Sequence, residues 1–381
     1  MLTAIVPRVD AVGEVSPGLS PRVAQLTALA ARGLGAAYDP AADTFAQTVR
    51  AVSGPAGVQL CREGRSLRYT AIAALGLSRL PVAAQRAVLD GLTAAEAAAL
   101  AARRAETSSN PGAVALAVWA AAETGAFARA LIARLRDDIA SGRPLPTVDA
   151  AWILTAAVKA NTLGDTDDLV TMTAALLRRH HGPAYPHMLP ATSSPRWRAH
   201  VGSFADQVYP LQALALAGAL SADRDLVAHA DRIAETIVGA QGPAGQWWWH
   251  YDARDGSVVE RYPVYSVHQH AMAPMVLLDL WESGGADHRQ AIARGLGWLR
   301  THPETLDELV SERHGLIWRK VGRREPRKAA RAAGALATSV RPGMRLPGLD
   351  LVLPPGQIDH ECRPYELGWL LYAWLAADRH E

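Results

Sequence analysis

The sequence predicts an all-α protein folded as an (α/α)6 toroid, a closed ring in which inner and outer helices alternate. Nearly every periodic stretch is rich in Ala and Leu at the 3.6-residue spacing of a helix and is bounded by Gly, Pro, Asp or Ser. Six of these stretches are apolar on almost all sides, which predicts that they are buried. The stretches between them carry one charged stripe, which predicts outer helices that face solvent.

The buried stretches recur at irregular intervals of roughly 40 to 60 residues, with one long insertion before the last, a spacing typical of helical hairpin repeats. They begin at Tyr69, Ala113, Val148, Tyr209, Val267 and Tyr365. An open solenoid of the same hairpins is the alternative. Closure is favoured because the last buried stretch follows its own polar loop and would complete a ring. We expect one domain over residues 1–381, an N-terminal extension over 1–20, and no sheet larger than a minor hairpin.

The individual helices are expected near 21–35, 40–52, 67–78, 81–104 with a break at Gly91, 112–123, 126–141, 148–160, 167–179, 205–220, 222–240, 264–282, 287–301 and 364–377. One segment departs from the helical pattern. A basic, proline-containing insertion over 319–349 precedes the last inner helix, and against Glu325 it carries Lys320, Arg323, Arg324, Arg327, Lys328, Arg331, Arg341 and Arg345. This insertion is either a solvated surface loop or a lid that gathers an anionic substrate.

Composition excludes several classes of protein. The 381 residues hold 39 Lys and Arg against 37 Asp and Glu, a net charge of +2, so a nucleic-acid binder driven by overall charge is not expected. A hydrophobic fraction of 49% excludes bulk disorder. Cys61 and Cys362 form neither a disulfide framework nor a metal-binding pair. The chain shows no signal-like leader and no transmembrane run, so a cytoplasmic protein without cofactor or metal is expected.

One short motif carries a resemblance to a known superfamily. The segment from Ile237 to Trp247, with Gln241, Gly245 and Trp247, resembles the QW repeat of squalene-hopene cyclases and protein prenyltransferases. That resemblance implies that Gln241 ends an outer helix and that Trp247 leads into the next inner one. It supports the toroid. The zinc site of the prenyltransferases is not expected, because no Asp-x-Cys with a later His is present.

The same resemblance directs attention to the acidic motif of class II terpene cyclases. Asp165-Thr-Asp167-Asp168 matches its Asp-x-Asp-Asp pattern, but it opens an amphipathic helix, where capping and the helix dipole also favour acids. We therefore predict that these three aspartates lie at the end of the ring opposite to the segment from Trp247 to Asp252. Asp149, in the first turn of an inner helix, is the better positional counterpart.

The expected topology of the ring indicates where the candidate site lies. In an up-and-down toroid all inner helices begin at the same end of the ring, so the loops and first turns before them converge on one mouth. Catalytic candidates there are His268, Tyr265, His250, Asp252, Glu361 and Asp149, and substrate-binding candidates are Trp247, Trp248, Trp249, Tyr262, Gln269, Arg363, Tyr365, Arg68, Tyr69, Asp206 and Gln207.

The most informative run within this set is Trp-Trp-Trp-His-Tyr-Asp, over 247–252. Three consecutive Trp residues cannot all face one side of a helix or strand, so at least one is expected to line a cavity. His250 and Asp252 are two apart and would point the same way in an extended segment, where the carboxylate would stabilise the protonated ring. Tyr265 and His268 would share one helix face. Either histidine could instead be a buried core residue.

The residues before the last inner helix add a charged pair. Pro364 fixes the start of that helix, which leaves Glu361 and Arg363 in the preceding loop. The two side chains could brace the closure of the ring. Alternatively, Arg363 could bind a substrate carboxylate through its planar fork. We predict that His250, Asp252, Tyr265, His268, Glu361 and Arg363 meet in one pocket at the mouth.

A mouth lined with charged, aromatic and histidine side chains suits a substrate rich in hydroxyl groups and carboxylates. The sequence therefore predicts an enzyme that acts by general acid/base chemistry on a small-molecule or oligosaccharide substrate, with an acidic sugar favoured. Its layout is similar to that of uronic-acid hydrolases, polysaccharide lyases and glucuronyl epimerases. The alternatives are a class II terpene cyclase-like protein that protonates an isoprenoid through Asp149 or Asp167, and a non-catalytic binding or assembly protein on the same scaffold.

Overall fold

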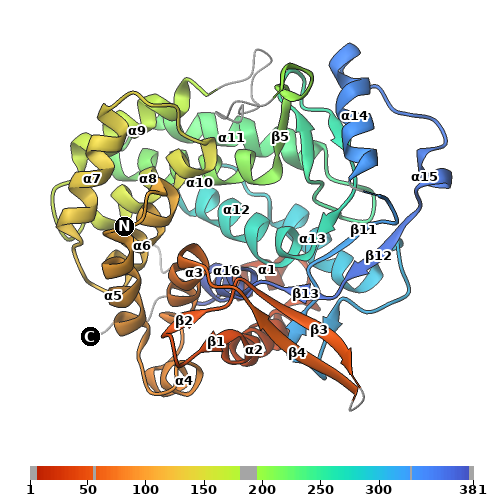
Figure 1. Cartoon of the computed structure of the whole chain (residues 1–381). Coiled ribbons are helices and arrows are strands. Elements are labelled where there is room, and N and C mark those ends of the chain that lie inside the picture. Colours follow the sequence, from red (N-terminus) through yellow and green to blue (C-terminus); the bar gives the residue numbers. More distant parts are fainter. Residues whose placement is uncertain (1–6, 55–56, 181–194, 327, 377–381) are drawn as a thin grey trace.

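Six inner helices form a closed ring in the computed structural model, which describes residues 7–54, 57–180, 195–326 and 328–376 (Figure 1). Within these residues the ring consists of α3 (Leu67–Leu77), α6 (Pro111–Glu123), α8 (Thr147–Ala160), α10 (Phe204–Ser221), α12 (Ala273–Glu282) and α16 (Pro364–Trp374). Each helix packs against the next, and α16 lies between α12 and α3. The predicted toroid is confirmed, and its ring is closed rather than an open stack.

An outer layer of amphipathic helices surrounds this ring. It consists of α2 (Leu19–Ala37), α5 (Ala94–Ala105), α7 (Arg129–Ala140), α9 (Asp167–Arg178), α11 (Arg224–Gly239) and α13 (Arg289–Thr301). In α11 the residues Leu226, Ala230, Ile233 and Ile237 are buried at helical spacing, and Asp223 caps the helix start. The short helix α1 (Arg8–Val15) packs on α2 and α13, so part of the expected N-terminal extension is helical. A further short helix, α4 (Val82–Val88), packs on α2.

Two glycines allow the ring to close. Gly76 of α3 and Gly368 of α16 face each other where the two helices cross. A Cβ atom added to Gly368 would lie 2.6 Å from the backbone oxygen of Ile72, closer than any real Cβ contact. The backbones of α3 and α16 therefore approach to a distance that no other residue type permits at these positions.

At the far end of the ring, buried ion pairs connect the ends of neighbouring helices. Glu123, the last residue of α6, accepts hydrogen bonds from Arg79 at 2.7 Å and from the Tyr372 hydroxyl of α16 at 2.5 Å. The Lys159 ammonium of α8 lies 3.1 Å from the same carboxylate. Burial works to raise the pKa of Glu123, but the charges of Lys159 and Arg79 outweigh it and hold that pKa at about 2. The buried charges at this end of the ring are therefore compensated.

Strands are more extensive than the sequence predicted. Five small sheets, counted over the described residues, are built from β1 (Tyr38–Asp39), β2 (Thr44–Phe45), β3 (Thr48–Gly54), β4 (Gly57–Glu63), β5 (Val201–Ser203), β6 (His250–Asp252), β7 (Val258–Glu260), β8 (Val264–Tyr265), β9 (Val310–Ser311), β10 (Leu316–Ile317), β11 (Lys320–Arg323), β12 (Pro355–Asp359) and β13 (Glu361–Cys362). The expectations of a helix over 40–52 and of no more than a minor hairpin were wrong. β2 and β3 occupy 44–54, and β13 pairs with β3 from the other end of the chain. Local periodicity cannot predict a pairing between segments so far apart in the sequence.

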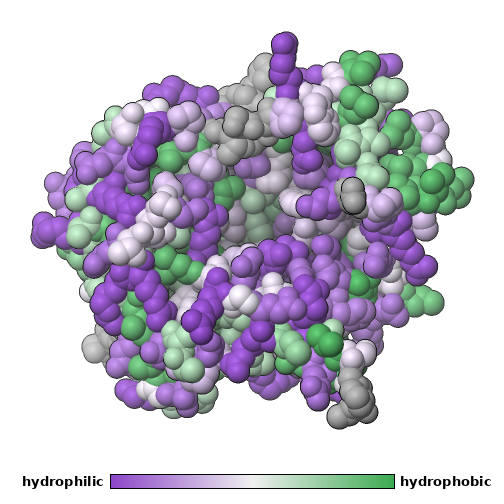
Figure 2. Space-filling model, in the orientation of Figure 1, coloured by the Kyte–Doolittle hydropathy of each residue, from purple (hydrophilic) through white to green (hydrophobic). Residues whose placement is uncertain are grey.

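The basic insertion is a folded structure. β11 pairs with β8 and β12, and α14 (Ala329–Val340) packs against β7 and against the short helix η1 (Arg196–Arg198), while α15 (Leu349–Val352) precedes β12. Arg323 is bound by Glu260 and Asp350 at 3.0 and 2.8 Å. The expectation for Arg327 falls outside the described residues. Leu336, Val340 and Leu351 leave an exposed apolar face on α14 and α15, seen at the right of Figure 2.

No described helix combines the length and the apolar character that crossing a membrane requires.

We expect Gly368→Ala to destabilise the ring by about 1–3 kcal/mol, because the added methyl group overpacks a backbone crossing that cannot relax without separating α16 from α3. Urea unfolding measures the change. Gly297→Ala is the control: Gly297 lies within α13 with nothing within 4 Å of an added Cβ, so this substitution should be neutral or stabilise by up to about 1 kcal/mol. Equal unfolding midpoints for Gly368→Ala and wild type would contradict the role of this crossing.

Candidate active site

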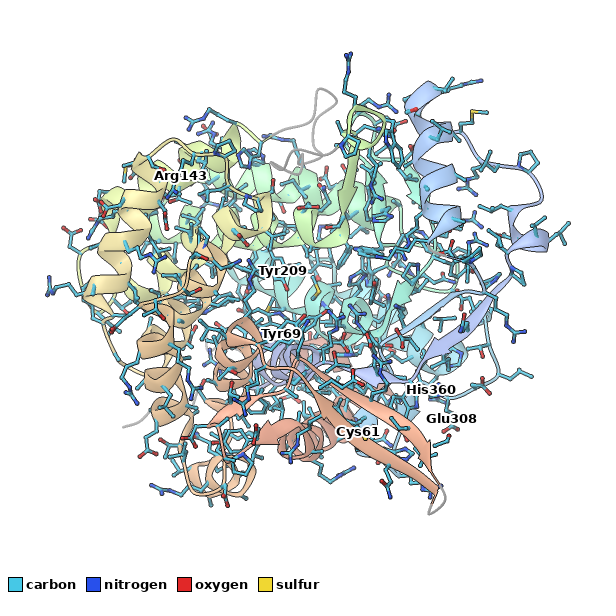
Figure 3. The ribbon with its side chains drawn as sticks, in the orientation of Figure 1. Cys61, Tyr69, Arg143, Tyr209, Glu308 and His360 are labelled. Carbon is cyan, nitrogen blue, oxygen red and sulfur yellow. The ribbon has the colours of Figure 1, made fainter. Side chains whose placement is uncertain are left out.

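A cavity of about 430 Å³ lies at the mouth where the inner helices begin. Figure 2 shows the hollow at the centre of this face, and in Figure 3 the labelled Tyr69 and Tyr209 lie near the middle of the ring. The lining residues come from α3, α8, α10, α16, β8, the π-helix η2 (His268–Met272) and the start of the basic insertion. They are Gln47, Ser66, Arg68, Tyr69, Ile72, Val148, Trp152, Ala205, Tyr209, Trp249, Tyr265, His268, Met272, Arg319 and Tyr365.

Six of these lining residues are Tyr or Trp. Tyr69 and Tyr365 lie with ring centroids 4.7 Å apart. Two further pairs stand edge to face, Trp152 with Tyr209 at 5.1 Å and Trp249 with Tyr265 at 4.8 Å. Such rings offer flat apolar surface with polar edges, which suits a ligand that is apolar on one face and hydroxylated at its rim.

Arg68 lines one side of the cavity and pairs with Asp149, which is buried next to it and is not itself among the lining residues. The Nη2 atom of Arg68 donates to Oδ1 of Asp149 at 2.9 Å and to the side-chain oxygen of Asn110 at 2.6 Å, while its guanidinium lies 5.1 Å from the Trp152 ring centroid. Burial raises the pKa of Asp149, although the charge of Arg68 opposes this. A Cβ atom on Gly112 would collide with this carboxylate, so the glycine makes room for it. Asp149 thus holds a proton more readily than an exposed aspartate does.

A second arginine crosses the opposite wall. Arg319 donates to Glu361 at 2.7 Å and to Glu366 at 3.3 Å, and its guanidinium lies 5.0 Å from the Tyr265 ring centroid. Burial raises the pKa of Glu366 to about 7 despite the nearby charge of Arg319. Arg319 occupies the position predicted for Arg363. The Arg363 side chain instead donates to the Tyr69 hydroxyl at 3.1 Å, behind the cavity wall.

The histidines at the mouth are buried and uncharged. His268 lines the cavity and stacks on Phe204 with centroids 4.3 Å apart. Burial lowers the pKa values of His268, His250 and His270 to about 3. The Nδ1 atom of His268 has no hydrogen-bond partner among the described residues, and neither ring nitrogen of His270 has one. A π-helix at this point fits a functional site, since such turns are frequent there.

The predicted meeting of six residues in one pocket was only partly correct. The structure brings Tyr265 and His268 to the cavity and sets Glu361 behind Arg319, but it separates His250 from Asp252. The irregularity in this sheet lies on β7, where Val259 is skipped in the pairing with β6, and the two side chains of β6 bind different partners. His250 stacks on Trp249 at 4.5 Å, whereas Asp252 is held by Arg254 at 2.7 Å away from the cavity.

Some of the remaining candidates line the cavity, and the others pack in the structure around it. Among the three tryptophans Trp249 lines the cavity, which confirms that at least one would. Trp247 is fully buried against Gly295, and Trp248 contacts Tyr262. Tyr262 itself lies beneath Arg323, with its ring centroid 4.8 Å from the guanidinium.

Of three further candidates, two form hydrogen bonds with the backbone and one is buried within its helix. Gln269 accepts from the Trp247 N–H at 3.2 Å and donates to the Tyr265 carbonyl. Asp206 accepts from the backbone and hydroxyl of Ser203 in a capping box. Gln207 is fully buried in α10. These residues therefore do not line the cavity.

The acidic motif of 165–168 lies at the far end of the ring, as predicted. Asp167 accepts from Asn161, which follows the last turn of α8, and Asp168 pairs with Arg136 of α7 at 2.8 Å. Asp149 lies in the first turn of the same α8, beside the cavity. The QW-like segment has a structural role. The Gln241 side chain donates hydrogen bonds to the backbone oxygens of Gly245 and Ala291. No cluster of three or more His, Cys, Asp or Glu suited to a metal occurs over the described ranges.

Comparison with known proteins places the chain by its fold. No protein-family model matches it, and no curated protein matches it either. A crystal structure of an unsaturated glucuronyl hydrolase specific for heparin matches with a TM-score of 0.54 and 15% identity, over 92% of this chain and 95% of that one. The unsaturated glucuronyl hydrolase from Bacillus sp. GL1, responsible for degradation of glycosaminoglycan, matches with a TM-score of 0.53 and 13% identity, over 93% and 97%.

The chain therefore has the six-hairpin toroid fold of these carbohydrate-active enzymes. At such identities the likeness concerns the fold and does not carry over residues of the site. The resemblance to terpene cyclases and prenyltransferases finds no support in these comparisons.

We expect the His270→Phe variant to lose less stability in acid than wild type does. His270 has a folded pKa of about 3, against about 6.5 when unfolded, so unfolding takes up a proton between these values and the free energy of unfolding falls as pH falls below 6.5. A phenyl ring removes this dependence and sacrifices no hydrogen bond found in the described structure.

Urea unfolding of both proteins from pH 7 to pH 5 measures the effect. The difference in free energy of unfolding should change by about 1 kcal/mol per pH unit in favour of the variant. The raised pKa of Glu366 has the opposite effect on the pH dependence of stability. Glu366 is present in both proteins, so its contribution cancels when the two free energies of unfolding are subtracted. Parallel curves would show that folding does not lower the pKa of His270.

Proposed function

We propose that the protein is a hydrolase that binds an acidic sugar in the central cavity and uses Asp149 as its proton donor. The observation that carries the proposal is a buried carboxyl group with a raised pKa, held by Arg68 on the wall of a cavity lined by aromatic rings. A carboxyl group tuned in this way can deliver a proton to a substrate near neutral pH.

The aromatic wall and the two arginines favour a sugar that carries a carboxylate. Trp152 and Trp249 offer ring faces for a pyranose, while Arg68 and Arg319 supply positive charge. Burial raises the pKa of Glu366 to about 7, so this carboxyl group compensates the charge of Arg319 less than an ordinary glutamate would. The positive charge that remains on Arg319, which also pairs with Glu361, can attract a substrate carboxylate to its planar fork.

Two polar groups remain for orienting the substrate. Burial raises the pKa of Tyr265 to about 12, so the phenol stays protonated and donates a hydrogen bond. The neutral His268 can accept or donate through the nitrogen that lacks a partner among the described residues. The same pair would serve a lyase or an epimerase if it removed a proton from the carbon next to the substrate carboxylate.

The names of the matched structures suggest the first substrates to test, which are disaccharides ending in an unsaturated uronic acid. Saturated acidic oligosaccharides and neutral oligosaccharides complete the set. Hydrolysis of the unsaturated sugars removes the ultraviolet absorbance of the conjugated double bond, whereas a lyase acting on the saturated sugars creates it. Turnover of neutral sugars alone, or of none of the three sets, would contradict the proposal.

Asp149→Asn should lower kcat by about 10²- to 10⁴-fold, because an amide cannot donate the proton although it retains the shape of the carboxyl group. The melting temperature should stay close to that of wild type. Asp168→Asn is the matched control: it removes a carboxylate from the far end of the ring, half-exposed and paired with Arg136, and should leave kcat unchanged. If both variants turn over substrate as wild type does, Asp149 is not the acid.

A further inference from the structure

The exposed residues of α14 are apolar. One side of this helix packs against β7 and η1 and buries small residues such as Gly334. The exposed residues recur at intervals of three and four, so they lie along the opposite side of the helix: Ala329, Ala332, Leu336 and Val340. A surface helix ordinarily presents charged or polar residues to water. The outward side of α14 therefore has the character of a surface that a partner covers.

The same apolar surface continues through the turn after α14 into α15. Met344 of this turn and Leu351 of α15 line one pocket of about 280 Å³ together with Gly334 of α14, so the three segments lie against one another. The large exposed side chains of these segments form what we call the apolar face: Leu336, Val340, Met344, Leu351 and Val352. An exposed apolar patch built from two separate helices is typical of an interaction site.

The apolar face projects from the molecule. Figure 1 shows α14 and α15 standing out from the ring at one edge, and Figure 2 shows hydrophobic residues gathered there. Leu351, Val340 and Val352 are 88%, 78% and 77% exposed. Side chains that project this far are suited to enter a partner rather than to receive one. Behind them, α14 is joined to the neighbouring sheet through a small core of its own, made of Val201, Val259 and Ala335.

Unpaired arginines surround the apolar face. Arg341 directly follows Val340, and Arg345 lines the same pocket as Leu351. The backbone N–H of Arg324 donates to the Pro354 carbonyl, two residues beyond α15. All three arginines are exposed, and within the part of the chain that the structure describes none of them forms an ion pair. The acid of α15, Asp350, is already bound by Arg323 at 2.8 Å. The rim of the apolar face is therefore positive, and its complement is an anionic surface.

The composition of the apolar face favours a lipid bilayer over a protein as that surface. Residues 329–352 contain no Trp, Tyr or Phe. The side chains that dominate binding at protein interfaces are mostly Trp, Tyr and Arg, whereas Leu and Val are under-represented among them. A protein partner would also have to supply a groove shaped to several projecting side chains. The acyl chains of a bilayer surround such side chains without a preformed groove, while cations beside them contact anionic headgroups.

We propose that the apolar face docks on the surface of a bilayer that contains anionic lipid. The aliphatic side chains enter the boundary between headgroups and acyl chains, and Arg324, Arg341 and Arg345 contact the headgroups. This docking is peripheral, because it buries side chains of a projecting lobe and leaves the ring in water. It is independent of the proposed hydrolase activity, since no residue of the apolar face lines the central cavity.

Sedimentation with vesicles tests the proposal. Wild type should bind vesicles made of equal parts of phosphatidylcholine and phosphatidylglycerol more tightly than vesicles of phosphatidylcholine alone, and about 1 M salt should weaken the binding. The double variant Leu351→Ser and Val352→Ser should lower the partition coefficient on the anionic vesicles by about 10- to 100-fold. The double variant Arg341→Gln and Arg345→Gln should lower it by about 10- to 30-fold. These positions are exposed, so melting temperatures should equal that of wild type.

Two control variants make the same chemical changes elsewhere. Leu306→Ser removes a fully exposed leucine outside the apolar face, and the pair Arg103→Gln and Arg178→Gln removes two exposed charges from α5 and α9. Both should bind vesicles within about 2-fold of wild type.

Three results would overturn the proposal. The first is wild-type protein that binds neither kind of vesicle, and the second is equal binding to both kinds. The third is binding by the variants of the apolar face and its rim that equals binding by the controls. Gel filtration of the same proteins identifies the other occupant: a wild-type dimer that Leu351→Ser and Val352→Ser dissociate, without vesicle binding, would make this face a contact between two copies of the chain.

Discussion

The crossing of α16 over α3 at Gly76 and Gly368 is the constraint on which the rest of the structure depends. Without a close approach there, the ring would remain an open stack of hairpins. The crossing also builds the site, because Tyr69 and Tyr365 come from the first turns of these two helices and form one wall of the cavity. Ring closure and this wall of the cavity therefore depend on the same pair of elements.

The two ends of the ring differ in how their charges are compensated. At the far end Glu123 is surrounded by Arg79, Lys159 and Tyr372, and every contact favours its ionised form. At the mouth, burial dominates and raises the pKa values of Asp149 and Glu366. A buried charge that is fully paired stabilises one protonation state, whereas partial pairing leaves the group able to exchange a proton. The two ends of the ring therefore differ in how readily their buried carboxyl groups exchange a proton.

Local periodicity was sufficient to predict the ring because inner helices must be apolar on all sides. Stretches such as 113–119 have this character in their sequence, and the structure buries them. The rule that inner helices begin at one mouth then placed Arg68, Tyr69, Tyr265, His268 and Tyr365 at the cavity. These predictions needed only the helical period and the direction of the chain.

Most of the failures share one physical cause, which is pairing between segments distant in sequence. Arg319 reaches the cavity because β11 pairs with β8, and nothing in the local sequence encodes that register. His250 and Asp252 do not pair as expected, because Asp252 is bound by Arg254 and His250 stacks on Trp249. The insertion was recognised by its charge, but its fold depends on partners elsewhere.

The closed ring also bears on how the chain folds during synthesis. The helices α3, α6 and α8 are neighbours in sequence and can pack as they emerge from the ribosome. The surface of α3 around Ile72 and Gly76, however, waits for α16, roughly 290 residues later. At bacterial and eukaryotic synthesis rates this wait lasts about 15–60 s. We therefore expect the flank of α3 that faces α16 to stay uncovered during most of translation and to be buried only after α16 has been made.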